Sequence, residues 1–229
     1  GYRGTPPTLA DLRRVLLEQP EAEAHDLALA SELYTTGSLN IFAHQTNVDT
    51  NARILCYDIR ELDEQLRPVG MVVTLDAIFN RVIRNRQQGR YTHVYIDEIY
   101  LFFSSGSGRG QSSINQYSGE FLYKCWKRFR KYGAMLTGIT QNVEECLRSE
   151  TAKLMFANSE FLLMFNQAAT DRMELAKLLG TSDAQMDHVN NAPAGHGLIK
   201  VGGAIVPFIN DFPKDTELYR LMSTRPGEG

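Results

Sequence analysis

Three observations in the sequence predict an α/β fold, with a mostly parallel sheet flanked by helices. Short apolar segments alternate with longer amphipathic ones from residue 92 to residue 190, which is the pattern of strands joined by helical crossovers. The apolar segment 94–96 runs straight into two adjacent acids, as strands do where an open α/β sheet binds ligands. The 229 residues, 43% of them hydrophobic, can bury one full core with room for a small second lobe.

Composition excludes several classes of protein. A net charge of −3 provides no global basic field of the kind that marks nucleic-acid binding. The cysteines at 56, 125 and 146 are far apart, which suits buried thiols in a reducing compartment rather than disulfides or zinc. The five histidines have no metal-ligand spacing, no apolar run reaches the roughly 20 residues of a membrane span, and we expect no signal peptide. Because the chain begins at Gly1 without a methionine, we expect a fragment.

The N-terminal part is expected to be helical. Thr8 and Asp11 suggest a helix start before an apolar stripe of leucines, and a second helix should cover 22–34. We assign residues 1–50 to part of an all-helical lobe and residues 51–229 to the α/β core. The core should begin with a strand over 54–59 and a long helix over 71–88 that ends at Gly89.

The rest of the core should alternate between strands and helices. The tract 104–113 has the serine and glycine content of a flexible linker. Gly202 and Gly203 favour the turn of a final hairpin. The expected strands are 92–99, 134–140, 160–165, 197–201 and 204–209, and the expected helical segments are 114–132, 143–157, 169–179 and 182–190.

Asp97 and Glu98 are the first candidate site. They follow a buried strand, where one acid can hold Mg²⁺ on a nucleotide and the other can polarise a water molecule. This is the form of a Walker B strand. The alternative is a strand whose end is merely solvated by acids, because apolar residues followed by Asp-Glu occur by chance in many sheets.

Two further patterns suggest polar groups for the same site. In the helix over 114–132, Arg128 and Arg130 border the apolar arc, and either could reach a neighbour's phosphate as an arginine finger. The lysines of that helix are better explained as a solvated face. Gln141 follows the strand over 134–140 and could orient a water, while Asn142 could cap the next helix. Gln167 repeats the pattern after the strand over 160–165, and we expect both amides at one sheet edge.

An ordered set of motifs resembles the C-terminal ATPase domain of the VirB-four family, the large ATPases of type IV secretion and conjugative transfer. The resemblance covers nearly the whole chain, and it is specific as a set although each motif alone is weak. The motifs are Thr46–Asp49, Leu75–Arg81, Asp97-Glu98, Lys127–Gly133, Gly138–Asn142, Asn158–Phe161, Asn166-Gln167, Asp171-Arg172, Gly195–Ile199, Pro207-Phe208 and Phe212–Tyr219.

The resemblance implies a RecA-like P-loop NTPase core with part of a helical lobe, using ATP and Mg²⁺. It implies an oligomer, often hexameric, that lies at the inner face of the bacterial cell membrane with other type IV secretion subunits; contact with DNA is left open. It also implies roles for eight residues. Asp97 would hold the metal, Glu98 would be the catalytic base, Arg128 or Arg130 would be the finger, Gln141 would complete the catalytic set, and Thr140, Gln167 and Arg172 would contact the nucleotide.

One departure from the family is clear. The phosphate-binding loop G-x-x-x-x-G-K-[ST] is absent, and no Gly-Lys pair occurs in the chain, so the β- and γ-phosphates have no cradle. We expect that the loop and its strand lie upstream of Gly1 and that the fragment alone is inactive. Two alternatives remain, namely a DNA-pumping motor of the FtsK/HerA or coupling-protein type and a non-catalytic scaffold.

Overall fold

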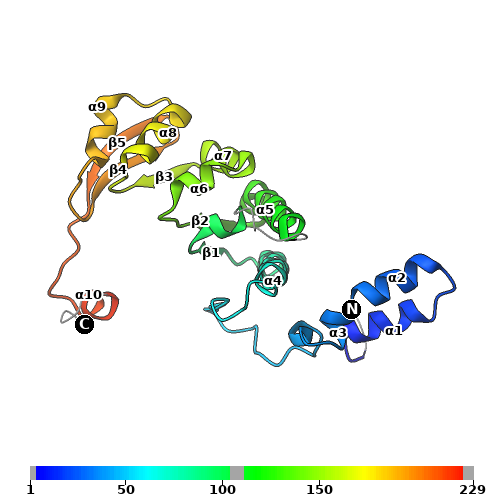
Figure 1. The fold of residues 1–229 in the computed structure, drawn as a ribbon. Coiled ribbons are helices and arrows are strands. Elements are labelled where there is room, and N and C mark those ends of the chain that lie inside the picture. The colour runs from blue at the N-terminus through cyan, green and yellow to red at the C-terminus, as the bar shows by residue number, and fades with distance from the viewer. Residues whose placement is uncertain (1–3, 104–110, 224–229) are drawn as a thin grey trace. The chain divides into compact units, whose positions relative to one another are not determined.

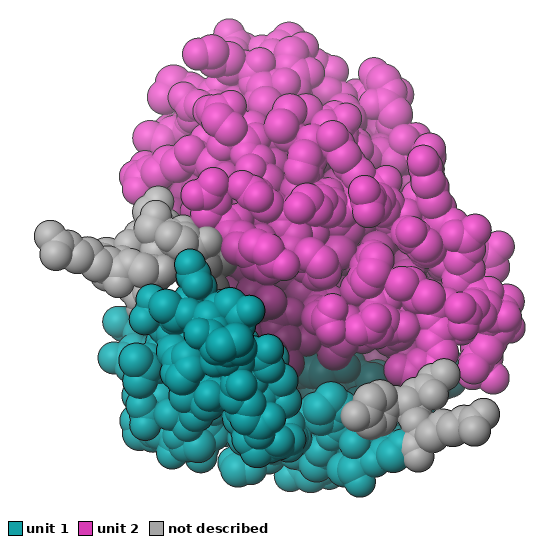
Figure 2. All heavy atoms as spheres, turned by 90° about the vertical axis from the view of Figure 1, so that its right-hand side faces the viewer, with its two compact units in different colours: residues 1–67 teal, residues 68–229 magenta. Residues whose placement is uncertain are grey.

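The structure is a computed structural model that describes residues 4–103 and 111–223 (Figure 1). The expected linker at 104–113 therefore lies mostly outside the described residues. The chain divides into two compact units, residues 1–67 and 68–229 (Figure 2). No helix in the described ranges is both long and apolar enough to cross a membrane.

Residues 9–42 of unit 1 are mostly helical, as the sequence predicts for the N-terminal part of the chain. Thr8 caps the first helix through a capping box, because its hydroxyl accepts from the Asp11 backbone N–H and its own N–H donates to the Asp11 carboxylate. Arg13 ties the first helix to the next two by donating to the Ala28 carbonyl at 3.2 Å and pairing with Glu32 at 3.5 Å. The elements are α1 (Leu9–Leu17), α2 (Ala22–Ala30), α3 (Glu32–Thr35) and η1 (Asn40–Phe42).

The strand expected over 54–59 is wrong. These residues form no ladder, Ile54 is 77% exposed, and Asp58 pairs with its near neighbour Arg60. An apolar run becomes a strand only where a neighbouring strand offers hydrogen-bond partners, and none among the described residues does so here.

Unit 2 contains all five described strands, in the order that the sequence predicts. The helices and the final hairpin of unit 2 also begin and end within a few residues of their predicted positions, which is the usual uncertainty at element ends. The elements are α4 (Arg67–Gln87, which begins one residue before the unit), β1 (Thr92–Ile96), η2 (Ile99–Phe102), α5 (Gln111–Arg128), η3 (Phe129–Tyr132), β2 (Ala134–Gly138), α6 (Val143–Leu147), α7 (Glu150–Ala157), β3 (Phe161–Met164), α8 (Ala169–Leu179), α9 (Asp183–Met186), η4 (Asp187–Val189), β4 (His196–Val201), β5 (Ala204–Ile209) and α10 (Glu217–Met222).

The strands β1 and β2 form a parallel pair, with Thr92 opposite Ala134 and Ile96 opposite Gly138. One face of the pair is buried against α4 and α5 in a cluster built around Val94, Ala134 and Phe129. The other face leaves Tyr95 68% exposed. The alternation of buried and exposed residues along each strand follows from the two-residue period of a β-strand.

The sequence predicts that β3 joins the same sheet as β1 and β2, and this prediction is wrong. In the described structure, β3 forms no ladder with either strand. It pairs antiparallel with β4, with Met164 opposite Leu198, and β4 pairs with β5. The expected hairpin turns at Gly202, whose φ is +57°. The hairpin thus supplies β4, the strand with which β3 forms hydrogen bonds. The described structure is therefore mixed α/β with a small parallel sheet, and it does not contain a complete RecA-like core.

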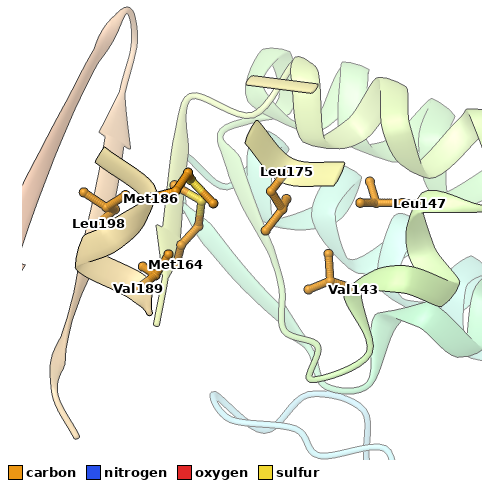
Figure 3. Packing of buried hydrophobic residues seen from close by; sticks show 7 residues of the cluster. All are labelled: Val143, Leu147, Met164, Leu175, Met186, Val189 and Leu198. Atoms are coloured by element: carbon orange, nitrogen blue, oxygen red, sulfur yellow. The ribbon is translucent and has the colours of Figure 1, made fainter. Parts of the chain in front are cut away.

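The antiparallel sheet is held by a cluster of buried hydrophobic residues (Figure 3). Leu198 on β4 and Val189 in η4 are fully buried, and Met164 on β3 packs beside them. The cluster continues to the helices that follow β2 and β3 through Val143, Leu147, Leu175 and Met186. It thus joins the C-terminal sheet to α6 and α8.

Candidate active site

The chain turns sharply at the carboxyl end of β1. The backbone N–H of Ile139 donates to the Ile96 carbonyl at 2.9 Å, and that of Ile99 donates to the Ile139 carbonyl at 3.0 Å. Between these bonds, Glu98 adopts the left-handed conformation, with φ 49° and ψ 47°. This conformation is disfavoured for residues with a side chain, and such strain gathers at functional sites.

A close approach by η2 fixes this turn. A β-carbon built at Gly138 would lie only 2.5 Å from the Ile99 Cδ1 atom. Only glycine therefore lets Ile99 lie against the end of β2 without displacement. The glycine of the Gly138–Asn142 motif thus has a structural role, namely to bring the residues after β1 onto the residues after β2.

The two acids have different surroundings. The Asp97 side chain is exposed, and its carboxylate accepts from the Glu98 backbone N–H at 3.0 Å. Glu98 is half-buried, and its Oε2 atom is buried without a hydrogen-bond partner in the described structure. An unsatisfied buried carboxylate oxygen is costly, so this atom needs a donor from a bound molecule such as water.

Thr140 and Cys146 lie beside Glu98. Burial raises the pKa of the Cys146 thiol to about 11, against a hydrogen bond with Thr140, and the charges of Glu145 and Glu98 raise it further. The thiol is therefore protonated at neutral pH, and it lies within the electrostatic reach of the acid. From the sequence, Cys146 is expected only to be a buried thiol, because no local spacing connects residue 146 to residue 98.

The loop after β2 behaves as predicted for a helix start. Asn142 caps α6 by accepting from the Glu145 backbone N–H at 3.2 Å, and its own N–H donates to Thr140 Oγ1 at 3.0 Å. These bonds fix Thr140 at the edge where Glu98 lies. Gln141, between the two, is exposed to solvent, so its amide is available to a bound molecule.

Gln167 and Arg172 are held by other partners. The Gln167 amide donates to the Phe165 carbonyl at 3.3 Å, and Arg172 donates to the Asn190 side chain. No hydrogen bond of the described residues joins either to Asp97 or Glu98. The two amide-ended strands belong to different sheets, so the single edge expected for Gln141 and Gln167 is wrong in this structure.

The first turn of α8 nevertheless lies beside α6. Burial raises the pKa of the Asp171 carboxyl, the Glu144 charge raises it further, and a hydrogen bond from the Glu144 backbone opposes both. Contacts therefore run from Glu98 through α6 to the start of α8, where Arg172 is the next residue. Arg172 thus borders the site without entering it.

Arg128 and Arg130 lie at the opposite end of the parallel sheet. Both are exposed, and both precede the first residue of β2, whereas the acids follow the last residue of β1. Five residues of strand span roughly 16 Å. The structure therefore does not bring either arginine to the acids of the same chain.

The chemistry of the donors fits Mg²⁺ only in part. No group of three or more His, Cys, Asp or Glu in the described residues could hold a metal by itself. Mg²⁺ commonly uses one or two carboxylates and completes its shell with water and phosphate oxygens, and Asp97 meets that need. These 229 residues do not supply a phosphate-binding loop, since its Gly-Lys pair is absent from them.

Comparison with known proteins supports the fold. No family model matches the sequence, and no curated protein matches it. The fold matches the solved structure of VirB4 from Thermoanaerobacter pseudethanolicus with a TM-score of 0.74 and 22% sequence identity over 93% of this chain. The chain spans 58% of the length of that protein. A VirB4-like fold, which the motifs imply, is thereby confirmed.

Proposed function

We propose that this chain is the acid-bearing part of a VirB4-type ATPase domain that powers type IV secretion or conjugative transfer. The observation that carries the proposal is the Glu98 carboxylate. It follows a parallel strand directly, is held in a strained conformation, and keeps a buried oxygen without a donor. Backbone strain of this kind concentrates at catalytic sites.

Each residue of the edge then has a role in ATP hydrolysis. Asp97, exposed at the end of the strand, would hold Mg²⁺ on the nucleotide. Glu98 would accept the proton of the attacking water at its unpaired oxygen, and Gln141 would orient that water. Thr140, fixed by the cap of α6, would border the nucleotide. Mg²⁺, when bound, supplies neutralisation of the charge that develops on the phosphates.

The position of the arginines supports a shared site. Because Arg128 and Arg130 lie at the far end of the sheet, either can act only on the nucleotide of a neighbouring copy. A head-to-tail assembly, closed as a ring, would place this basic end against the next copy's acids. We propose such an oligomer, with other type IV secretion subunits, at the inner face of the bacterial cell membrane.

Two substitutions test the proposed roles in the protein that carries this chain together with a phosphate-binding loop. Glu98→Gln should lower ATP turnover by about 10²–10⁴-fold while nucleotide affinity persists, because only the base is removed. Asp97→Asn should weaken Mg-nucleotide binding itself. Steady-state turnover and equilibrium binding distinguish the two. Equal loss of binding in both variants would refute the roles. Turnover by the 229-residue chain alone that Glu98→Gln abolishes would instead refute the expectation that the chain is inactive without the phosphate-binding loop.

Mixing experiments test the shared site. Arg128→Ala or Arg130→Ala, whichever removes the finger, should reduce turnover by about 10³–10⁵-fold with nucleotide affinity nearly unchanged. Lysine should not substitute, since it lacks the planar fork. Mixing that variant with Glu98→Gln should restore part of the activity, because some interfaces then hold one intact base and one intact arginine. Absence of rescue in demonstrably mixed assemblies would exclude a finger acting between copies.

A further inference from the structure

Two stretches of unit 2 are free of acidic residues and rich in basic ones. Residues 77–96 and 121–143 contain none of the chain's 27 Asp and Glu residues but nine of its 24 Lys and Arg residues. The rest of the chain is strongly acidic, so the net charge of −3 conceals a local basic field. The nine are Arg81, Arg84, Arg86, Arg90, Lys124, Lys127, Arg128, Arg130 and Lys131.

The fold brings the two stretches together at the amino end of the parallel sheet. The end of α4 meets η3, where the Arg86 guanidinium lies 5.1 Å from the centre of the Tyr132 ring. Phe79 of α4 packs on Phe129 and Tyr132 in the same place. The basic residues of both stretches are therefore carried by one packed cluster rather than by separate loops.

Three lysines form a row along this surface. Lys124, Lys127 and Lys131 have the spacing i, i+3, i+7 on α5 and its continuation in η3, and all three are exposed. Lys127 lies over the Tyr123 ring, 4.4 Å from its centre. In the part of the chain that the structure describes, none of the three lysines forms an ion pair. Favourable interaction with a helix C-terminus accounts for cations in the last turn only, and Lys124 precedes that turn.

Tyr91 adds an aromatic surface to the cations. Its side chain is 83% exposed, it follows Arg90 directly, and it lies beside Gly133, where an added β-carbon would be 3.5 Å from its ring. The ring thus stands between the end of α4 and the end of η3. An exposed ring among exposed cations is the arrangement on which bases of single-stranded nucleic acids stack while cations hold the phosphates.

We propose that this surface, made of Arg86, Arg90, Tyr91, Lys124, Lys127 and Lys131, binds single-stranded nucleic acid. An anionic membrane is a less suitable partner, because the apolar face of α5 and η3 is buried in the core through Leu122, Cys125 and Phe129 and has nothing to insert among lipids. The proposed surface includes neither Arg128 nor Arg130, and binding to it does not require ATP hydrolysis. The proposal can therefore be tested independently of the proposed function.

Binding of a fluorescein-labelled oligodeoxythymidylate to the 229-residue chain, measured by fluorescence anisotropy without nucleotide, tests the proposal. Affinity should fall steeply with salt, with a logarithmic slope of about −0.7 for each phosphate contacted. The triple variant Lys124→Gln, Lys127→Gln, Lys131→Gln should weaken binding and reduce the slope by about 2. A matched control neutralises three exposed cations elsewhere, Lys177→Gln, Lys214→Gln and Arg220→Gln, and should leave affinity within about twofold.

Tyr91 distinguishes stacking from simple charge attraction. Tyr91→Ala should weaken oligonucleotide binding by about tenfold or more, whereas Tyr91→Phe should retain it, because the ring is what stacks. Circular dichroism checks that the variants fold. Three results would overturn the proposal: no binding at physiological salt, equal effects of the patch and control triples, or binding to phosphatidylglycerol vesicles that oligonucleotide cannot displace.

Discussion

The parallel sheet β1–β2 and the antiparallel sheet β3–β4–β5 differ in what occupies their ends. The parallel pair ends in Asp97 and Glu98, with a strained backbone and an unpaired carboxylate oxygen. The strand β3 of the antiparallel sheet leads into a segment whose polar side chains are bonded to other parts of the chain, since Gln167 donates to the Phe165 carbonyl and Arg172 donates to Asn190. The first region keeps polar groups available to a ligand, whereas the second uses them to hold its own loops.

Their interiors differ as well. The buried cluster of the antiparallel sheet reaches across β3, β4, α6, α8, α9 and η4, so many elements depend on it. The cluster under the parallel pair is made mainly by α4 and α5 on a single face. We infer that stability is concentrated around Leu198 and that reactivity is concentrated around Glu98. The following predictions test this division, beginning with the largest expected effect on stability.

The largest effect should come from Leu198, which is fully buried on β4. Leu198→Ala should lower the free energy of unfolding by about 2–5 kcal/mol, because it removes apolar contacts and leaves a cavity. Leu163→Ala on β3 is the control, since Leu163 is 54% exposed and should cost much less. Urea unfolding followed by circular dichroism measures both. Similar losses in the two variants would show that the cluster is not the main source of stability.

A smaller effect of opposite sign is expected at Glu98. Glu98→Gly should raise the free energy of unfolding by about 1 kcal/mol, because glycine adopts the left-handed conformation without strain and the unpaired buried oxygen is removed. Asn191→Gly, at φ 53° in the loop before β4, is a matched control without a role in the site. Should Glu98→Gly destabilise the protein, the idea of strain retained for function would fail.

The smallest effect concerns Asp171, at the junction of the two regions. Its pKa is raised by burial and by Glu144, so its contribution to stability is present below the unfolded value of 3.8 and is lost as pH rises through the folded value. Asp171→Asn should therefore be slightly more stable than the wild type at neutral pH, and the difference should vanish below pH 4. Thermal midpoints measured from pH 3 to pH 7 test this sign, which a constant difference would contradict.

Local sequence patterns were sufficient for much of this protein. The cap at Thr8, the helix end at Gly89, the cap at Asn142 and the turn at Gly202 all appear where residue chemistry predicts them. Each depends on contacts within a few residues, where the identity of a side chain largely decides the backbone conformation. The Asp97-Glu98 pair also lies at the end of its strand, because an apolar run followed by acids is itself a local signal.

Only the tertiary structure decided the sheet partners and the shape of the site. The segment at 54–59 found no neighbouring strand, and β3 paired with the hairpin instead of joining β1 and β2. The pairing of strands depends on contacts between distant segments, which a strand's own sequence does not specify. The same holds for Cys146 beside Glu98, for Gly138 under Ile99, and for the basic surface at the end of α4 and η3. The sequence determined which groups this protein carries, and the fold determined which of them meet.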